Sequence, residues 1–139
     1  MVTAQPENNM AVTLNKFLFE HRVKKPVVVE KTWGRELWFA NNSEHNYCGK
    51  ILEINSGQSF SMHAHKLKAE SFFCLSGRVR LEIIDCLSHN ANIHTFELNP
   101  GGSFDIEPLL PHKITALEDS KIIEASTFHR EDDSYRYWR

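Results

Sequence analysis

Four side chains of metal-ligating type occur at spacings that can bring them together. His63 and His65 are two residues apart, so on a β-strand their side chains point to the same face. Glu70 follows five residues later, and residues 66–69 can form the bend into a neighbouring strand. Two imidazoles and a carboxylate suit a borderline divalent metal such as Mn, Fe, Co, Ni or Zn. His112, which begins another expected strand after a proline-rich turn, is the best candidate for a fourth ligand.

The composition narrows the class of protein. The chain has 139 residues, enough for one domain with a hydrophobic core. Its formal net charge is −2 without a long run of either sign, which disfavours a nucleic-acid partner. No apolar run approaches the roughly 20 residues of a membrane helix, and residues 1–9 lack the apolar stretch of a secretory signal. We therefore expect a cytoplasmic protein with neither a membrane nor a nucleic-acid partner.

The histidines and cysteines add to this picture. There are eight histidines, many for this length, which favours metal binding. The three cysteines, Cys48, Cys74 and Cys86, are an odd number without CxxC spacing. We interpret them as free thiols in a reducing compartment.

Short strands separated by turn residues dominate the pattern from Pro26 onward. Val79, Leu81 and Ile83, for example, alternate with charged residues, as expected for a strand with one buried face. About ten such strands with little helix indicate an all-β, antiparallel jelly-roll barrel. The expected strands are 27–31, 35–40, 47–54, 59–65, 71–75, 79–84, 93–98, 103–106, 112–117 and 121–127.

The chain divides into an N-terminal segment and one barrel. Residues 1–25 form the segment, in which residues 1–9 are an expected leader and residues 10–22 form either a short helix or an edge strand. Residues 26–139 form the barrel.

Residues 57–77 resemble the first sequence motif of the cupin superfamily. That motif, Gly-x5-His-x-His-x4-Glu-x6-Gly, is matched at every defined position. The second cupin motif, Gly-x5-Pro-x-Gly-x2-His-x3-Asn, is matched at its first glycine, Gly101, and at its histidine, while its proline, inner glycine and asparagine are absent. The resemblance implies a cupin jelly-roll barrel that binds one divalent transition metal through His63, His65, Glu70 and His112.

Segments on both sides of these motifs resemble sugar-processing cupins, in particular the cupin domain of type II mannose-6-phosphate isomerases. The matching features are Trp33-Gly34, Lys50 on the strand before the first motif, and an acidic pair followed by Arg136. The resemblance implies that Lys50 and Arg136 bind the substrate. Two other interpretations stay open, because Lys50 could extend to water from a strand end and Arg136 could pair with Asp132 or Asp133 at the surface.

Other polar and aromatic residues receive structural assignments. We expect His129 to lie on the surface. The aromatic residues are expected to pack in the core; they are Trp33, Trp38, Phe39, Phe60, Phe72 and Phe73.

Taken with the resemblance, the sequence predicts a metal-dependent isomerase or epimerase of a sugar or sugar phosphate. The metal would act as a Lewis acid on a carbonyl while a base, for which Glu107 and Glu124 are candidates, moves a proton between carbons. Two alternatives stay open, since the same ligands hold iron in cupin dioxygenases and a metal cupin can bind a small ligand without catalysis. Small cupins commonly pair through their sheets, and the apolar residues 14–19 suit a segment that crosses to a partner. We therefore expect a homodimer.

Overall fold

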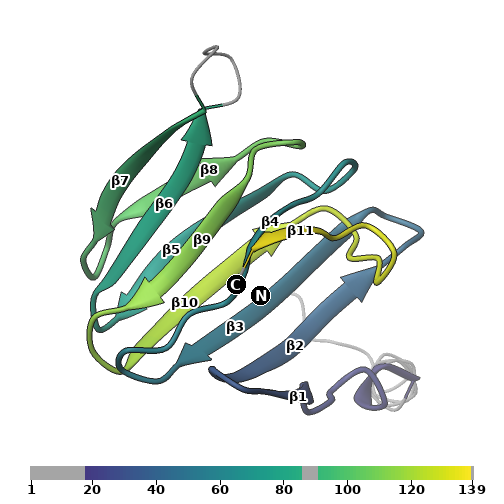
Figure 1. The fold of residues 1–139 in the computed structure, drawn as a ribbon. Helices are drawn as coiled ribbons and strands as arrows, with labels where there is room; N and C mark the ends of the chain where they lie inside the picture. The colour runs from purple at the N-terminus through teal and green to yellow at the C-terminus, as the bar shows by residue number, and fades with distance from the viewer. Residues whose placement is uncertain (1–17, 86–90, 139) are drawn as a thin grey trace, which may run out of the picture.

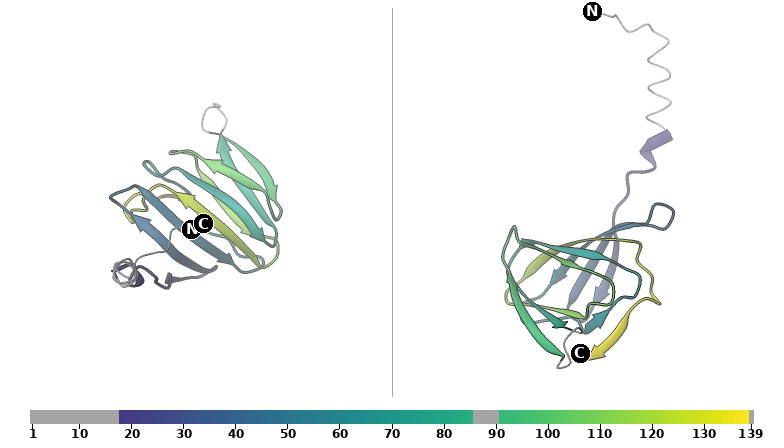
Figure 2. Two further views of the ribbon diagram at one scale, coloured as in Figure 1. Left: turned by 180° about the vertical axis from the view of Figure 1, so that it is seen from behind. Right: turned by 90° about the horizontal axis from the view of Figure 1, so that it is seen from above.

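The computed structural model describes residues 18–85 and 91–138, which form two facing antiparallel sheets (Figures 1 and 2). The six-stranded sheet consists, in spatial order, of β1 (Val27–Lys31), β2 (Gly34–Asn42), β3 (Tyr47–Ile54), β10 (Ser120–Ser126), β5 (Glu70–Ser76) and β8 (Ser103–Ile106). The five-stranded sheet consists of β11 (Tyr135–Trp138), β4 (Met62–Ala64), β9 (His112–Ala116), β6 (Val79–Asp85) and β7 (Asn92–Leu98). This arrangement confirms the predicted jelly roll.

All ten expected strands are present, and β11 was not predicted. The predicted strand 59–65 is shorter in the structure, where β4 covers three residues and Ser59 forms only an isolated bridge to Thr115. β11 is a four-residue strand that pairs with β4, and all four of its residues are exposed. It lacks the alternation of buried and exposed residues on which the sequence prediction depended.

Alternating burial along the strands builds the core between the two sheets. Val79, Leu81 and Ile83 of β6 are buried, and they meet Ile114 of the adjacent strand β9 within one hydrophobic cluster. Leu52 of β3 and Phe72 of β5 belong to the same cluster on the opposite sheet. Burying a side chain of this size stabilises the fold by about 1.5–3 kcal/mol. The barrel therefore has a packed core, and its strands hold the residues that line the cavity.

The prediction that the whole aromatic set is core is wrong for Phe39 and Phe73, which are 46% and 38% exposed. Phe73 follows the buried Phe72 on β5, and consecutive strand residues face opposite sides of a sheet. Phe39 covers the space beside Gly49, where an added Cβ would collide with its ring. Both phenylalanines thus lie on the outer face.

Steric constraints explain why the last residue of the first motif, Gly77, is a glycine. Gly77 joins β5 to β6 with a φ of 82°, in the left-handed region that favours glycine. A Cβ at this position would also overlap the backbone of Asp119 and Ser120. The turn therefore requires glycine, and it fixes how β5 leads into the core strand β6.

Several predictions concern residues outside or at the border of the described ranges. Residues 1–17 and Cys86 are not described, so the leader and most of the apolar segment 14–19 remain predictions. Residues 18–20 form a single helical turn. Cys48 and Cys74 are buried free thiols, as expected. In the described part of the chain, no helix has the length and apolar character needed to cross a bilayer.

Candidate functional site

Three histidines meet where β4 and β9 lie side by side. His63 on β4 is directly opposite His112, the first residue of β9, and His65 follows one residue after the end of β4. One ring nitrogen from each histidine lies within 4.8 Å of the other two. The spacing of His63 and His65 along a strand thus places both on the face that His112 also reaches.

Main-chain carbonyls hold each of these rings in one orientation. The Nδ1 atom of His63 lies 2.8 Å from the carbonyl oxygen of Ser61, and that of His112 lies 2.9 Å from the carbonyl oxygen of Leu110. The Nδ1 atom of His65 faces the carbonyl oxygen of Asp133 in the same way. A carbonyl oxygen can only accept, so each Nδ1 carries the proton and donates it. In the neutral rings the Nε2 lone pairs are left free to bind a cation.

Glu70 brings a carboxylate to the same point. Its Oε1 atom lies 2.8 Å from Nε2 of His112 and 3.7 Å from Nε2 of His65. Neither Glu70 Oε1 nor His112 Nε2 has a hydrogen-bond partner, although both are fully buried. Unpaired buried lone pairs that face each other are costly unless a cation lies between them. These residues therefore fit a divalent metal, and the three histidines can hold one.

Burial favours the neutral form of His63 and His65. Burial, with the neighbouring His112 as the second cause, lowers the pKa of His63 to about 3. Burial also lowers the pKa of His65. A neutral imidazole is the form that ligates metal, so these rings are ready to bind at physiological pH.

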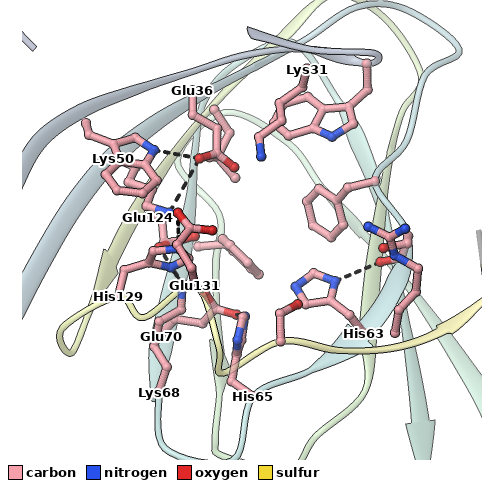
Figure 3. A pocket seen from close by; sticks show the side chains of 18 of the residues that line it. Lys31, Glu36, Lys50, His63, His65, Lys68, Glu70, Glu124, His129 and Glu131 are labelled. Carbon is pink, nitrogen blue, oxygen red and sulfur yellow. Dashed lines mark hydrogen bonds and ion pairs between the residues drawn. The ribbon is translucent and has the colours of Figure 1, made fainter. Parts of the chain in front are cut away.

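A buried network of acids and lysines lies across the cavity from the histidines (Figure 3). Lys68, which is 3% exposed, places its Nζ atom 3.0 Å from Glu124 and 3.3 Å from Glu70. Burial alone would lower the pKa of Lys68, but the two carboxylates outweigh it and raise that pKa. Burial raises the pKa of Glu124, and the nearby charge of Glu70 raises it further against the opposing effect of Lys68.

A second buried lysine, Lys50, also lies beside a carboxylate. Lys50 is 2% exposed and points into the cavity, with its Nζ atom 3.5 Å from Glu36 and 4.1 Å from the centre of the Trp38 ring. The indole N–H of Trp38 donates a 2.6 Å hydrogen bond to Glu36. Lys50 therefore does not extend to water. We refer to His63, His65 and His112 as the histidine side, and to Glu36, Lys50, Lys68 and Glu124 as the acid–lysine side.

The two sides enclose a cavity of about 810 Å³. Arg136 lies along its wall and is exposed, and no ion pair involving it occurs among the described residues. The alternative pairing with Asp133 is wrong, because that carboxylate accepts from backbone N–H groups instead. His129 also lines the cavity, with its ring centre 4.9 Å from that of Trp38, so the prediction of a surface position is wrong. Glu107 borders a different, smaller hollow.

Comparison with solved structures identifies the fold. The structure of KdgF from Halomonas sp. has a TM-score of 0.64 and 17% identity, covering 81% of this chain and 93% of that one. Oxalate decarboxylase from Bacillus subtilis has a TM-score of 0.68 and 19% identity, covering 80% of this chain and 30% of that one. The chain has a cupin fold. The capsular polysaccharide assembling protein CapF from Staphylococcus aureus shares it, with a TM-score of 0.69 and 15% identity over 84% of this chain and 34% of that one.

One curated protein is similar to this chain in sequence. The D-lyxose/D-mannose isomerase of Thermosediminibacter oceani is 30% identical over 107 residues, covering 63% of this chain. The match spans 59% of that relative's own length. No protein-family model matches the chain. The chain is therefore similar in sequence, over part of its length, to a sugar isomerase.

Sequence reasoning identified the histidine side of the cupin site but only part of the acid–lysine side. Glu124 shares its face of β10 with the buried Ile122 and Ser120, so alternation could have placed it inside. Lys68 lies in a loop, where no periodicity shows which way a side chain points. Glu36 and Trp38 share one face of β2, but that strand has no fully buried residue to reveal its inner side.

Proposed function

We propose that this chain is a metal-dependent isomerase that interconverts the aldose and ketose forms of an unphosphorylated sugar. The convergence of three imidazoles and Glu70 in one cavity, opposite the buried Glu124–Lys68 pair, carries the proposal. The relative whose name records D-lyxose/D-mannose isomerase supports the reaction class.

The metal ligands would be His63, His65, Glu70 and His112. Their donor set, three nitrogens and one oxygen, suits Mn, Fe, Co, Ni or Zn. When bound, such a metal supplies Lewis acidity to the carbonyl of the open-chain sugar. The carbonyls that accept from the Nδ1 atoms would keep each ring turned toward the ion.

Glu124 is the proton-transfer group in this proposal. Its carboxylate takes the proton from the carbon next to the carbonyl and returns it to the former carbonyl carbon. The hydroxyl proton moves to the former carbonyl oxygen, so the sugar keeps its composition. Burial raises the pKa of Glu124, which makes it a stronger base than an exposed carboxylate. Lys68, 3.0 Å away, orients it. Glu107 borders another hollow and is not placed to serve.

The charge pairing in the cavity favours a neutral sugar over a sugar phosphate. Both buried lysines already face carboxylates, Lys50 at Glu36 and Lys68 at Glu124 and Glu70. The exposed wall carries two cations, Lys31 and Arg136, and two acids, Glu30 and Glu131, so these four residues add no net charge. A phosphate dianion requires donors whose charge is not already matched, whereas sugar hydroxyls bind well between paired charges.

An isomerase assay on metal-loaded protein tests the proposal. The chain is stripped of metal, loaded separately with each of the five metals, and incubated with D-lyxose, D-mannose and D-mannose 6-phosphate. We expect conversion of a free sugar by at least one metal form and much slower conversion of the phosphate. His63→Ala should lose metal affinity by more than about 100-fold, and Glu124→Gln should keep the metal but lose about 10²–10⁴-fold in kcat.

The control and the contrary outcomes separate this proposal from its rivals. His45→Ala, at an exposed histidine outside the cavity, should behave as wild type. Oxygen consumption by the iron form without isomerisation would indicate a dioxygenase. Sugar binding without turnover in every metal form would indicate a binding protein. Either result would overturn the proposed reaction.

A further inference from the structure

The segment after β10 returns to the metal site from the far end of the sequence. Thr127 and the residues after it lead to β11, which pairs with the ligand-bearing strand β4 so that Arg136 lies opposite His63. Figure 1 shows β11 running beside β4. Asp133 lies in this segment, between β10 and β11. It is only 4% exposed, although its neighbours Asp132 and Ser134 are exposed.

The carboxylate of Asp133 accepts hydrogen bonds from three consecutive backbone N–H groups. Its Oδ1 atom lies 2.8 Å from the nitrogen of Lys66 and 3.2 Å from that of Leu67. Its Oδ2 atom lies 3.2 Å from the nitrogen of Leu67 and 3.1 Å from that of Lys68. The next N–H, of Ala69, donates to the hydroxyl of Thr127 at 3.1 Å. Every N–H between His65 and Glu70 is therefore bound by the returning segment.

The backbone of the same residue contacts a candidate ligand directly. The carbonyl oxygen of Asp133 accepts the hydrogen bond from Nδ1 of His65. For His63 and His112, the corresponding carbonyl belongs to a residue two positions earlier in the chain. His65 alone among the three has a partner 68 residues away.

From these contacts we propose that Asp133 is a positioning residue for the metal site. Its carboxylate sets the shape of loop 66–69 and so the separation of His65 from Glu70, while its carbonyl sets the orientation and tautomer of His65. The inference rests on the proposed metal site but not on the reaction assigned to it. Groups that orient metal ligands in this way typically change metal affinity by 10- to 100-fold when removed.

Cobalt titration of metal-free variants tests the role. Asp133→Asn keeps the size of the side chain, but its NH₂ group cannot accept, so one side of the loop loses its partner. We expect about 10-fold weaker Co²⁺ binding and an altered visible spectrum at saturation, because the ligand geometry changes. Asp133→Ala should weaken binding by up to about 100-fold. The exposed neighbour provides the matched control, and Asp132→Asn should bind as wild type.

Thermal unfolding of the metal-free forms separates positioning from a loss of folding. If Asp133→Ala unfolds, Asp133→Asn carries the test. A variant that is only less stable would show the wild-type spectrum once saturated, and that result would overturn the proposal. Wild-type metal affinity in Asp133→Asn would overturn the positioning role of Asp133 and leave the proposed function standing. Failure of the wild-type chain to bind any of the five metals would overturn it together with the proposed function, whereas metal binding without isomerase activity would leave only the reaction refuted.

Discussion

The histidine side and the acid–lysine side face each other across one cavity, yet different interactions hold their side chains in place. On the histidine side, main-chain carbonyls accept from all three Nδ1 atoms. On the acid–lysine side, side chains hold one another, as Lys68 does with Glu124 and Lys50 with Glu36. Figure 3 shows the acid–lysine contacts together with the hydrogen bond made by His63.

This difference has an energetic consequence. A carbonyl that loses its imidazole partner is still part of a fixed backbone, so the loss is confined to one hydrogen bond of roughly 1 kcal/mol. A buried carboxylate that loses its lysine becomes an uncompensated charge, which is far more costly. The acid–lysine side should therefore determine the stability of the cavity, while the histidine side determines what it binds.

The largest effect is expected for Lys68→Met. This change leaves two buried carboxylates, Glu70 and Glu124, without their shared cation and should lower the free energy of unfolding by about 3–5 kcal/mol. Urea denaturation measures it. Adding Glu124→Gln should recover part of the loss, whereas the exposed Lys121→Met should change stability by less than about 0.5 kcal/mol. A loss below 1 kcal/mol for Lys68→Met would contradict the distinction between the two sides.

A smaller effect is expected from pH. The pKa of His63 is lowered to about 3 in the folded protein, whereas an unfolded histidine takes up a proton near pH 6.5. Between these values the unfolded state binds more protons, so the stability of metal-free protein falls as pH falls from about 6.5 toward 3. The slope should reach up to about 1.4 kcal/mol per pH unit from this group. His63→Ala should reduce the slope measured by urea denaturation without abolishing it, because burial also lowers the pKa of His129 and His65. An unchanged slope would argue against a buried neutral ring at position 63.

The smallest effect is expected for Glu36→Gln. The amide oxygen can still accept from the Trp38 indole, so stability should fall by only about 1 kcal/mol. Lys50 loses its counter-charge, however, and the cavity gains one unit of positive charge. Inhibition by D-mannose 6-phosphate should therefore strengthen several-fold, while Glu30→Gln on the exposed wall should change it little. Equal inhibition of both variants by D-mannose 6-phosphate would show that Lys50 does not bind the phosphate.

The same difference explains how much could be predicted from sequence. His63 and His65 stand at a spacing that strand geometry explains, whereas His112 was a candidate because it begins a strand after a proline-rich turn and matches the histidine of the second cupin motif. Ten strands were predictable because turn residues separate them, and in strands such as β6 and β9 buried residues also alternate with less buried ones. Leu52 and Ile54 on the same face favoured an inward position for Lys50, but extension to water stayed open until the structure showed Lys50 to be 2% exposed.

What could not be predicted depends on contacts between distant segments. Asp133 looks like an ordinary tail residue, and its burial follows from loop 66–69 docking onto it. Lys68 resembles its exposed neighbour Lys66 until Glu124 of β10 is placed beside it. Local patterns carry no information about such pairings, because the partners are more than fifty residues apart.

Trp38 has a practical consequence for experiments on this cavity. Its indole ring lies close to both the ammonium group of Lys50 and the ring of His129, and its N–H donates a hydrogen bond to a carboxylate. Indole emission responds in wavelength and yield to neighbouring charges, so a molecule entering the cavity should change the fluorescence of the protein. Comparison with Trp38→Phe separates this signal from that of Trp33 and Trp138. The chain thus contains its own optical probe, and candidate sugars can be screened by titration before any product has been identified.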